Sequence, residues 1–338
     1  MVGVVQGGSH PRAEAVSILI CTHGASQTPM SIVRRSVVAA AAAALLTLSA
    51  QAQVTASVIG GALVVQGSPS ADALTISALG DAVTVSGNSG TTINGGASAS
   101  FSGVVNGIAV DLGAGDDFLF MVGSAPLGSA LFNMGAGDDV AVIARNVFSA
   151  DFCVDAGDSG PNGDIVSLGG SNPGDGNTVA GLLVVVGVGQ VGLGLRGSEV
   201  LGETCLLTED RNDKFLINGN TFRDTVVMWT GDGDDRIEFA SEPSSPANVV
   251  DRSVSVNVGQ GNDLVRFGSA SSAVSTIRRR TGIQLGFGDD TLEIANTIWE
   301  GPIMTRGGPG NDSASLQAVL LNNQFQQGVF ALDFETLQ

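Results

Sequence analysis

Histidine and cysteine are almost absent from this sequence, and basic residues are scarce. Of 338 residues, two are histidine, three are cysteine and 15 are lysine or arginine, against 33 aspartates and glutamates. Both histidines, His10 and His23, lie within the first 52 residues, which are argued below to be a leader. Without imidazole, the rest of the chain has no Ser-His-Asp triad, Cys-His pair or histidine-bound zinc. Most familiar hydrolase chemistry is therefore excluded.

The scarcity of basic residues also limits the partners. Removing residues 1–52 leaves 32 acidic and 12 basic side chains, a net charge of −20. Phosphate backbones and anionic lipid surfaces are bound by clustered Lys and Arg, so we expect neither nucleic acid nor a membrane as a partner. Cys21 also lies in the leader, and the two remaining cysteines, Cys153 and Cys205, allow one disulfide at most.

The segment from Met30 predicts export. It has a basic start containing Arg34 and Arg35, an apolar run over 37–48 and an Ala50-Gln51-Ala52 cleavage site. The run has about 12 residues, too few to span the roughly 30 Å of a bilayer as a helix. We predict that residues 1–29 are an upstream extension outside the fold, or a long n-region, and that 30–52 are a signal peptide. The mature chain would be extracellular, cell-surface or periplasmic, without insertion into the membrane.

Glycine is abundant, and it recurs in one five-residue motif. The 48 glycines leave little room for long helices. The pattern Gly-x-Gly-Asp/Asn-Asp begins at Gly113, Gly135, Gly231, Gly259, Gly286 and Gly308. We take its last Asp as a phase marker and add degenerate copies that end at 164, 191 and 213. The markers are then 117, 139, 164, 191, 213, 235, 263, 290 and 312, spaced by 22 to 28 residues.

The residues around each marker test this phase. The second and fourth positions after every marker are apolar, from Leu119 and Met121 in the first copy to Ala314 and Leu316 in the last. An alternation of period two predicts a strand with one buried face. Each unit is therefore predicted to be a strand, a glycine turn, a strand and a third short strand or loop. Apolar pairs are also predicted before the turn, at Val110/Leu112, Val184/Val186, Val256/Val258 and Ile283/Leu285.

Stacking joins these units into one core, because a unit of about 22 residues cannot bury its apolar face alone. We predict an all-β fold, a right-handed parallel β-helix (solenoid) of about nine coils over 111–338, with extra loop residues where the spacing is longer. Residues 53–110 carry shorter strands over 62–65, 73–77 and 82–86, and are expected to form an N-terminal β cap or the first coils. There, Asp72 and Asp81 precede similar apolar pairs. The tail, 330–335, is expected to be the last strand.

The motif resembles the Gly-Gly-x-Gly-x-Asp repeats of hemolysin-type (RTX) calcium-binding proteins. Its longer form, over 108–117, resembles bacterial extracellular β-helix repeat proteins. The resemblance covers about residues 61–338 and implies export and calcium. It departs in one respect, since RTX repeats follow in close tandem and enclose each ion from two turns, whereas here the turns are a full coil apart. That mode of calcium binding therefore does not transfer whole.

Stacked turns would bring carboxylates to about 5 Å, where repulsion costs a few kcal/mol per pair. Calcium would relieve it, because this ion accepts carboxylate, amide and backbone oxygens together. The alternative is that Asp and Asn occupy these turns because their side chains bond nearby backbone N–H groups. The candidate calcium ligands are Asp116, Asp117, Asp138, Asp139, Asp234, Asp235, Asn262, Asp263, Asp289, Asp290, Asn311 and Asp312.

Two functions are compatible with these features. The leading hypothesis is a non-enzymatic exported β-helix, stabilised by calcium or not, whose long side binds an extracellular polysaccharide or a surface protein. The rival is a lyase-type polysaccharide-active enzyme, for which Arg236 beside Asp234 and Asp235 would be the base. Trp229, which the alternation points outward, could stack on a sugar in either case.

Overall fold

The computed structural model describes residues 17–20, 33–36, 53–79, 82–123, 126–170, 174–241, 246–316, 324–325 and 329–337. The chain divides into two units, Met1–Ala50 and Gln51–Gln338. In the first unit, β1 (Ser17–Ile20) pairs antiparallel with β2 (Val33–Ser36). The second unit contains all the other strands.

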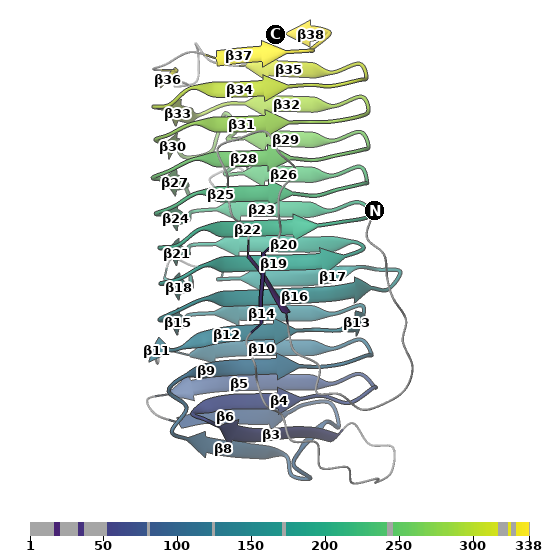
Figure 1. Ribbon diagram of the computed structural model, residues 1–338, viewed down its shortest axis with the longest axis vertical. Helices are drawn as coiled ribbons and strands as arrows, with labels where there is room; N and C mark the ends of the chain where they lie inside the picture. The colour runs from purple at the N-terminus through teal and green to yellow at the C-terminus, as the bar shows by residue number, and fades with distance from the viewer. Residues whose placement is uncertain are drawn as a thin grey trace. The chain divides into compact units, whose positions relative to one another are not determined.

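The second unit is a parallel β-helix made of three sheets (Figure 1). In each coil the chain runs along an entry sheet, turns at the aspartate motif, runs along an exit sheet, and then crosses a short sheet. Each strand pairs with the equivalent strand of the next coil. The described residues contain no helix, and so none that could cross a membrane. The predicted parallel β-helix is confirmed, with about eight full turns where nine coils were expected.

The strand bounds follow the markers closely. The exit sheet contains β5 (Ala73–Leu79), β6 (Ala82–Gly87), β8 (Ser98–Ser102), β10 (Phe118–Gly123), β14 (Val140–Ala144), β17 (Asp164–Leu168), β20 (Val191–Arg196), β23 (Lys214–Asn218), β26 (Arg236–Phe239), β29 (Leu264–Phe267), β32 (Thr291–Ile294), β35 (Ser313–Leu316) and β38 (Thr336–Leu337). The short sheet contains β11 (Pro126–Leu127), β15 (Val147–Phe148), β18 (Thr178–Val179), β21 (Glu199–Val200), β24 (Thr221–Phe222), β27 (Val249–Val250), β30 (Ser275–Ile277), β33 (Thr297–Trp299) and β36 (Gln324–Phe325).

The entry sheet forms the third wall. It contains β3 (Gln53–Ile59), β4 (Ala62–Gln66), β7 (Thr92–Ile93), β9 (Gly107–Asp111), β12 (Ser129–Asn133), β13 (Ala136–Gly137), β16 (Phe152–Ser159), β19 (Leu183–Val188), β22 (Thr204–Thr208), β25 (Val226–Trp229), β28 (Val254–Asn257), β31 (Thr281–Gln284), β34 (Ile303–Arg306) and β37 (Val329–Leu332).

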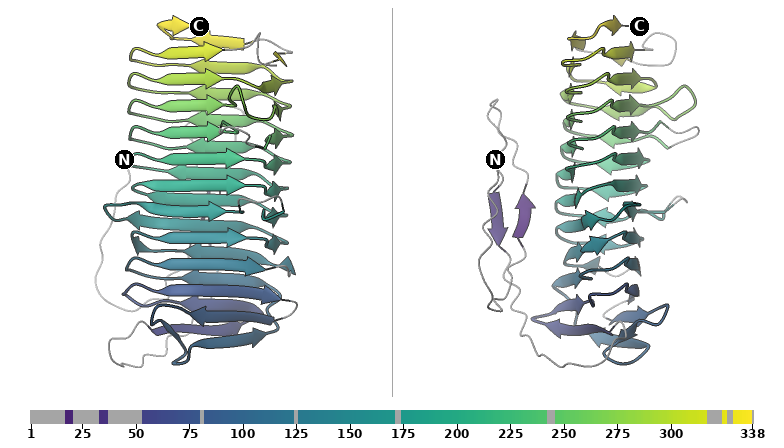
Figure 2. Two further views of the ribbon diagram at one scale, coloured as in Figure 1. Left: turned by 180° about the vertical axis from the view of Figure 1, so that it is seen from behind. Right: turned by 90° about the vertical axis from the view of Figure 1, so that its right-hand side faces the viewer.

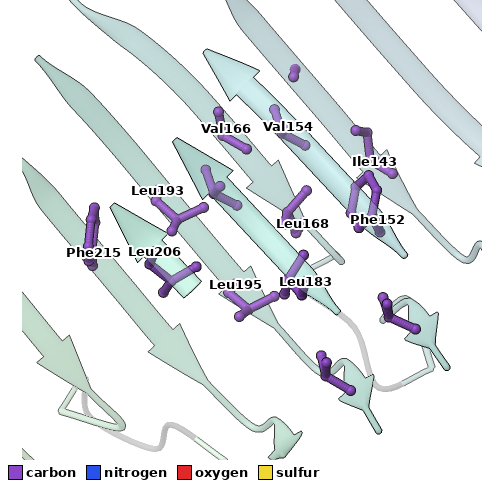
Figure 3. Packing of buried hydrophobic residues seen from close by; sticks show 14 of the residues in the cluster. Ile143, Phe152, Val154, Val166, Leu168, Leu183, Leu193, Leu195, Leu206 and Phe215 are labelled. Atoms are coloured by element: carbon purple, nitrogen blue, oxygen red, sulfur yellow. The ribbon is translucent and has the colours of Figure 1, made fainter. Parts of the chain in front are cut away.

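The core lies between the sheets and is filled by the alternating apolar residues. Along the exit sheet, Leu119 pairs with Ala141, and this row continues in register through Val166 and Leu193 to Ala314. All the predicted exit-strand pairs whose side chains are described are buried. Figure 3 shows side chains of the two longer sheets meeting in this interior. The phase of the exit strands is therefore confirmed.

One predicted core pair before the turn is wrong. The inward residues of β19 are Leu183 and Val185, while Val186 is half-exposed and Val184 lies outside the core cluster. The register explains the error. Val185 of β19 is aligned with Leu206 of β22, Met228 of β25 and Val256 of β28, so Val185 and Val256 occupy equivalent positions. Six residues separate Val185 from the marker at 191, and seven separate Val256 from Asp263. A turn shorter by one residue reverses the face that each side chain occupies.

The two ends of the stack differ in strand direction. At the N-terminal end, β4 and β5 pair parallel with β9 and β10, and antiparallel strands follow outside them: β3 on β4, and β6 then β8 on β5. The three strands predicted in this region are therefore present. Asp81 lies outside the described residues. At the other end, β37 and β38 continue the parallel pairing, with β37 covering part of the predicted last strand.

Candidate functional site

The repeated motif forms one corner of the β-helix, which we call the aspartate corner. Its glycines are required there by packing. Gly261 has φ +137°, and a Cβ built on it would lie 1.8 Å from the carbonyl oxygen of Gly233 in the preceding coil. Gly288 and Gly310 have the same environment one and two coils further. Only glycine allows the coils to approach this closely.

The last Asp of each motif forms a buried inner column. Its Oδ1 accepts the backbone N–H of the equivalent residue one coil earlier, so Asp117 N–H donates to Asp139, and Asp263 N–H to Asp290, at 2.7 and 2.8 Å. The column extends from Asp72 to Asp312 and then to Glu335, with N···O distances of 2.6 to 3.0 Å. It is interrupted once, where Asp164 N–H donates to the carbonyl oxygen of Gln190 instead.

The second carboxyl oxygen of these residues is buried without a partner. The column aspartates are at most 2% exposed. In the described part of the chain, one oxygen has no hydrogen-bond partner in Asp72, Asp117, Asp139, Asp164, Asp263, Asp290 and Asp312. An ionised carboxylate in such a place is costly, because nothing replaces the water lost from that oxygen. A neutral carboxylic acid avoids most of this cost.

The pKa values of the column move in that direction. Burial, aided by neighbouring carboxylates, raises the pKa of Asp117, Asp164 and Asp213 to about 7 and that of Asp263 to about 8, although the N–H donors oppose the rise. The pKa values of Asp139 and Asp290 rise to about 6, and those of Asp235 and Asp312 also rise. The charged groups acting most strongly on the column are themselves acidic: Asp116, Asp138, Asp158, Asp210, Asp232, Asp234, Asp289, Asp333 and Glu335.

The fourth motif residue forms a separate outer column that points the opposite way along the rod. Its Oδ1 accepts the backbone N–H of the equivalent residue in the next coil. The N–H of Asn262 donates to Asp234 Oδ1 at 2.7 Å, and the N–H of Asp289 donates to Asn262 Oδ1 at 2.9 Å. These side chains are exposed, apart from the half-buried Asp138. From 212 to 311 amides alternate with carboxylates, so neighbouring coils do not place two charges side by side. The order is Asn212, Asp234, Asn262, Asp289, Asn311.

The predicted calcium ligands are therefore not one cluster. Asp117, Asp139, Asp235, Asp263, Asp290 and Asp312 belong to the inner column, and Asp116, Asp138, Asp234, Asn262, Asp289 and Asn311 to the outer one. Among the described residues, no group of three or more His, Cys, Asp or Glu side chains is arranged to hold a metal ion. Calcium at these turns stays a prediction. Three members of the inner column were not among the candidate ligands: Asp164 and Asp213, which end degenerate copies of the motif, and Asp72, which precedes a similar apolar pair.

A second polar column, at what we call the asparagine corner, was not predicted. It lies where the chain passes from the exit sheet to the short sheet. Asn220 Oδ1 accepts the N–H of Ser198 at 2.9 Å, and Asn248 Oδ1 that of Asn220 at 2.9 Å. The amide nitrogen of Asn220 also donates to the carbonyl oxygens of Leu195 and Asn218. Asn146, Asn177, Ser198, Asn220, Asn248 and Ser275 are its members.

A sequence signal for this corner exists. Asn146, Ser198 and Asn220 each follow a marker by seven residues. Where a longer loop precedes the corner, the interval grows to 13, as from Asp164 to Asn177 and from Asp235 to Asn248. Figure 2 shows one such loop, between β29 and β30, projecting from the stack. The variable loop length hides the spacing.

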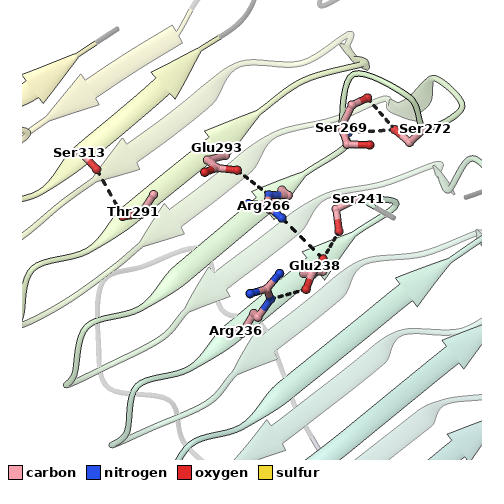
Figure 4. A network of polar contacts seen from close by, with 9 residues as sticks. All are labelled: Arg236, Glu238, Ser241, Arg266, Ser269, Ser272, Thr291, Glu293 and Ser313. Atoms are coloured by element: carbon pink, nitrogen blue, oxygen red, sulfur yellow. Dashed lines mark hydrogen bonds and ion pairs between the residues drawn. The ribbon is translucent and has the colours of Figure 1, made fainter. Parts of the chain in front are cut away.

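The outer face of the exit sheet carries a ladder of charged side chains. Glu238, Arg266 and Glu293 are in register on β26, β29 and β32, and Arg266 bonds Glu293 (Figure 4). Glu238 is only 5% exposed and also bonds Arg236 and Ser241, which together lower its pKa against the effect of burial. Arg236, considered above as a base, is thus bonded to a carboxylate on the outer face, whereas Asp235 is buried in the inner column.

Other single-residue predictions can now be placed. Cys153 and Cys205 are buried and not joined by a disulfide, since Val184 lies between them in the register. Trp229 is 40% exposed, as the alternation predicted. No family model matches the chain, and neither curated proteins nor solved structures contain a detectable relative.

Proposed function

We propose that this chain is an exported structural protein, a rod whose repeated motif holds its coils together and whose outer faces contact partners. The observation that carries the proposal is the inner column. The last residue of the repeated motif is an aspartate. Its carboxyl group bonds the neighbouring coil and is shielded from solvent, as in Asp263. Such a group supports the stack and does not reach a ligand outside it.

The inner column also suggests the pH range in which the rod is most stable. Its unpartnered oxygens favour the protonated form, and Asp263, with a pKa raised to about 8, shows this most strongly. A neutral column bonds the coils without mutual repulsion. The proposed rod is therefore an acid-tolerant one, most stable below neutral pH.

The start of the fold supports export. The compact unit begins at Gln51, and its first strand, β3, begins at Gln53, immediately after the predicted cleavage site at Ala52. Removal of residues 1–52 would leave every strand of the β-helix intact. The two features are what a cleaved signal followed by a folded mature domain requires.

Expression of the full chain in a two-membrane bacterium tests this proposal. We expect the protein outside the cytoplasm with a mass that corresponds to a start at Gln53. A variant with Leu45→Asp and Leu46→Asp should remain unprocessed in the cytoplasm, since the apolar run is interrupted. An unprocessed wild-type chain in the cytoplasm would contradict export.

A second assay tests the non-enzymatic part of the proposal. Pectate and alginate are incubated with the protein, and unsaturated lyase products are followed by ultraviolet absorbance. We expect none. Product formation that disappears in Arg236→Ala would favour the lyase instead.

A further inference from the structure

Beside the aspartate corner, two rows of outward side chains run along the rod. One row is formed by the last residues of β25, β28, β31 and β34, which are in register: Trp229, Asn257, Gln284 and Arg306. The other row lies three residues further along each coil, within the turn: Asp232, Gln260 and Phe287, which bridge one another in parallel register. The later members of these rows, Asn257, Gln260, Gln284, Phe287 and Arg306, border a groove of about 330 Å³, and Trp229 and Asp232 continue the rows one coil before it.

The floor of this groove is glycine, for a reason that lies in the fold. Gly259, Gly286 and Gly308 line it together with the walls. A Cβ built on any of the three would lie 1.8 to 1.9 Å from a carbonyl oxygen of the preceding coil. Side chains are thus excluded from the floor by the stacking of the coils, and the groove is a fixed feature of the rod.

The walls offer both apolar faces and amide groups. Phe287 is 61% exposed, more than most large apolar side chains of the rod, and Trp229, one coil outside the groove in the first row, is 40% exposed. Asn257, Gln260 and Gln284 each carry a donor and an acceptor. A ligand that suits such walls has apolar C–H faces and hydroxyl groups at its edges, which is the chemistry of a sugar ring.

The charges near the groove favour an uncharged sugar chain over an acidic one. Arg306 is the cation of the groove, and it already pairs with Asp333 at 3.6 Å. Asp232 accepts a hydrogen bond from the side chain of Gln260 at 2.8 Å and adds negative charge to the second row. Together with the net charge of −18, these carboxylates repel a polyanion. An uncharged sugar chain meets no such barrier.

A peptide strand is less suited to this groove, because the backbone of the floor is already paired. Phe287 N–H donates to Gly259 O, Gly261 N–H to Phe287 O, and Gly286 N–H to Gly307 O. Strand addition requires unpaired N–H and C=O groups at a sheet edge. Recognition must therefore use the side chains of the two rows.

We propose that this glycine-floored groove binds a neutral oligosaccharide lying along the rod axis, with one ring against Phe287, its hydroxyls bonded by Asn257, Gln260 and Gln284, and its end extending past the groove to Trp229 one coil before Asn257. The inference rests on the geometry of the groove alone, so it stands or falls independently of export.

Titration of the purified protein with neutral hexasaccharides tests the proposal, using cello-, xylo-, manno- and chito-oligomers. The chain has two tryptophans, of which Trp229 is exposed and Trp299 buried, so tryptophan fluorescence reports on a ligand that extends from the groove to the coil before it. Calorimetry gives the affinity. We expect saturable binding by at least one oligomer and weaker binding by hexagalacturonate, its acidic counterpart.

Variants then locate the site. Phe287→Ala should weaken binding by about tenfold or more, the equivalent of roughly 1.4 kcal/mol. Phe118→Ala removes another exposed phenylalanine, 41% exposed on β10, and should leave binding unchanged. The proposal is overturned if no neutral oligomer binds at 10 mM, if hexagalacturonate binds best, or if the two variants behave alike. Unchanged melting curves would show that both variants are folded.

Discussion

The aspartate and asparagine corners bond the coils in the same direction with different side chains. In both, a side-chain oxygen accepts the backbone N–H of the preceding coil, as Asp290 does for Asp263 and Asn248 for Asn220. The amide of Asn220 also donates to two carbonyl oxygens of its own surroundings. The second oxygen of Asp263 has no hydrogen-bond partner among the described residues. One corner is neutral, with both ends of an amide such as that of Asn220 bonded, and the other needs a proton.

This difference makes pH a property of one corner only. Amides do not titrate, so the asparagine corner should hold the coils equally well at any moderate pH. The aspartate corner should hold them best when its carboxyls are neutral. The fold therefore combines a pH-independent column with a pH-dependent one.

The largest expected effect is that of pH on the wild-type protein. The folded-state pKa values of about 6 to 8 in the inner column lie above the ordinary value of 3.8. The folded chain thus binds these protons more tightly than the unfolded chain, and the stabilisation, complete below about pH 4, is lost as the pH rises through 6 to 8. We expect the melting temperature to fall on the order of 10 °C from pH 5 to pH 8.5.

Calorimetric melts at the two pH values check this. Glu238, whose pKa is lowered by Arg236 and Ser241, acts in the opposite sense only at lower pH, so pH 5 avoids its protonation. A melting temperature that is constant or rises between pH 5 and 8.5 would mean that the column is not neutral.

The glycines give the next largest effect and separate the corners sterically. Gly261→Ala places a methyl group against the backbone of the preceding coil, which should cost about 4 kcal/mol or more. Gly197, just before Ser198 in the asparagine corner, has φ +63°, and a Cβ built on it would lie 3.8 Å from the backbone of Gly176, an ordinary van der Waals contact. Arg145 occupies the equivalent position with φ +58°. Gly197→Ala should cost only about 1 kcal/mol. Urea melts of both variants measure the difference, and equal losses would contradict it.

A charge placed in the neutral corner should destabilise the rod by a smaller amount. Asn220→Asp removes the donors to Leu195 O and Asn218 O and introduces a buried carboxyl. We expect a loss of about 3 kcal/mol at pH 8. The loss should shrink at pH 5, where the new carboxyl can be protonated. A loss independent of pH would show that the missing donors, and not the charge, are responsible.

The reverse substitution sharpens the comparison. Asp263→Asn keeps the acceptor for Asp235 N–H but puts an amide nitrogen where no acceptor was available to Oδ2. We expect a cost of about 1 kcal/mol at pH 5 and no cost, or a gain, at pH 8.5, where a charge has been removed. Thermal melts at both pH values should therefore show a shallower pH dependence than in the wild type. A dependence as steep as before would place the titrating groups elsewhere.

Much of this architecture could be predicted from the sequence, because each coil repeats the same information. Apolar pairs at fixed distances after the markers identified the exit strands and their inward face. The same parity places the marker itself on that face, two positions before an apolar residue, as with Asp117 and Leu119. The division into a buried and an exposed column is therefore contained in the pattern, although the last two residues of each motif are chemically alike as calcium ligands.

Two features were harder to predict for physical reasons. The strands of the short sheet have only two or three residues, too few for an alternation to appear. Loops of different lengths precede the asparagine corner, so its seven-residue interval holds only in some coils, as for Asn220. In β19 the turn is one residue shorter, and a run of valines fits either face. Composition alone cannot resolve such a register.

Calcium should have the smallest effect, and it too distinguishes the columns. The inner carboxyls are shielded, so an ion would have to bind the outer column, where Asp116 and Asp138 are the adjacent carboxylates without an intervening amide. With the millimolar affinity common in extracellular modules, 10 mM calcium would raise the melting temperature by only about 3 °C at pH 8.5. Asp116→Asn should abolish that rise, and Asp289→Asn, in the alternating stretch, should not. A rise on the order of 10 °C that also removes the pH dependence would instead place the ion among the inner carboxyls, in the role assigned here to protons.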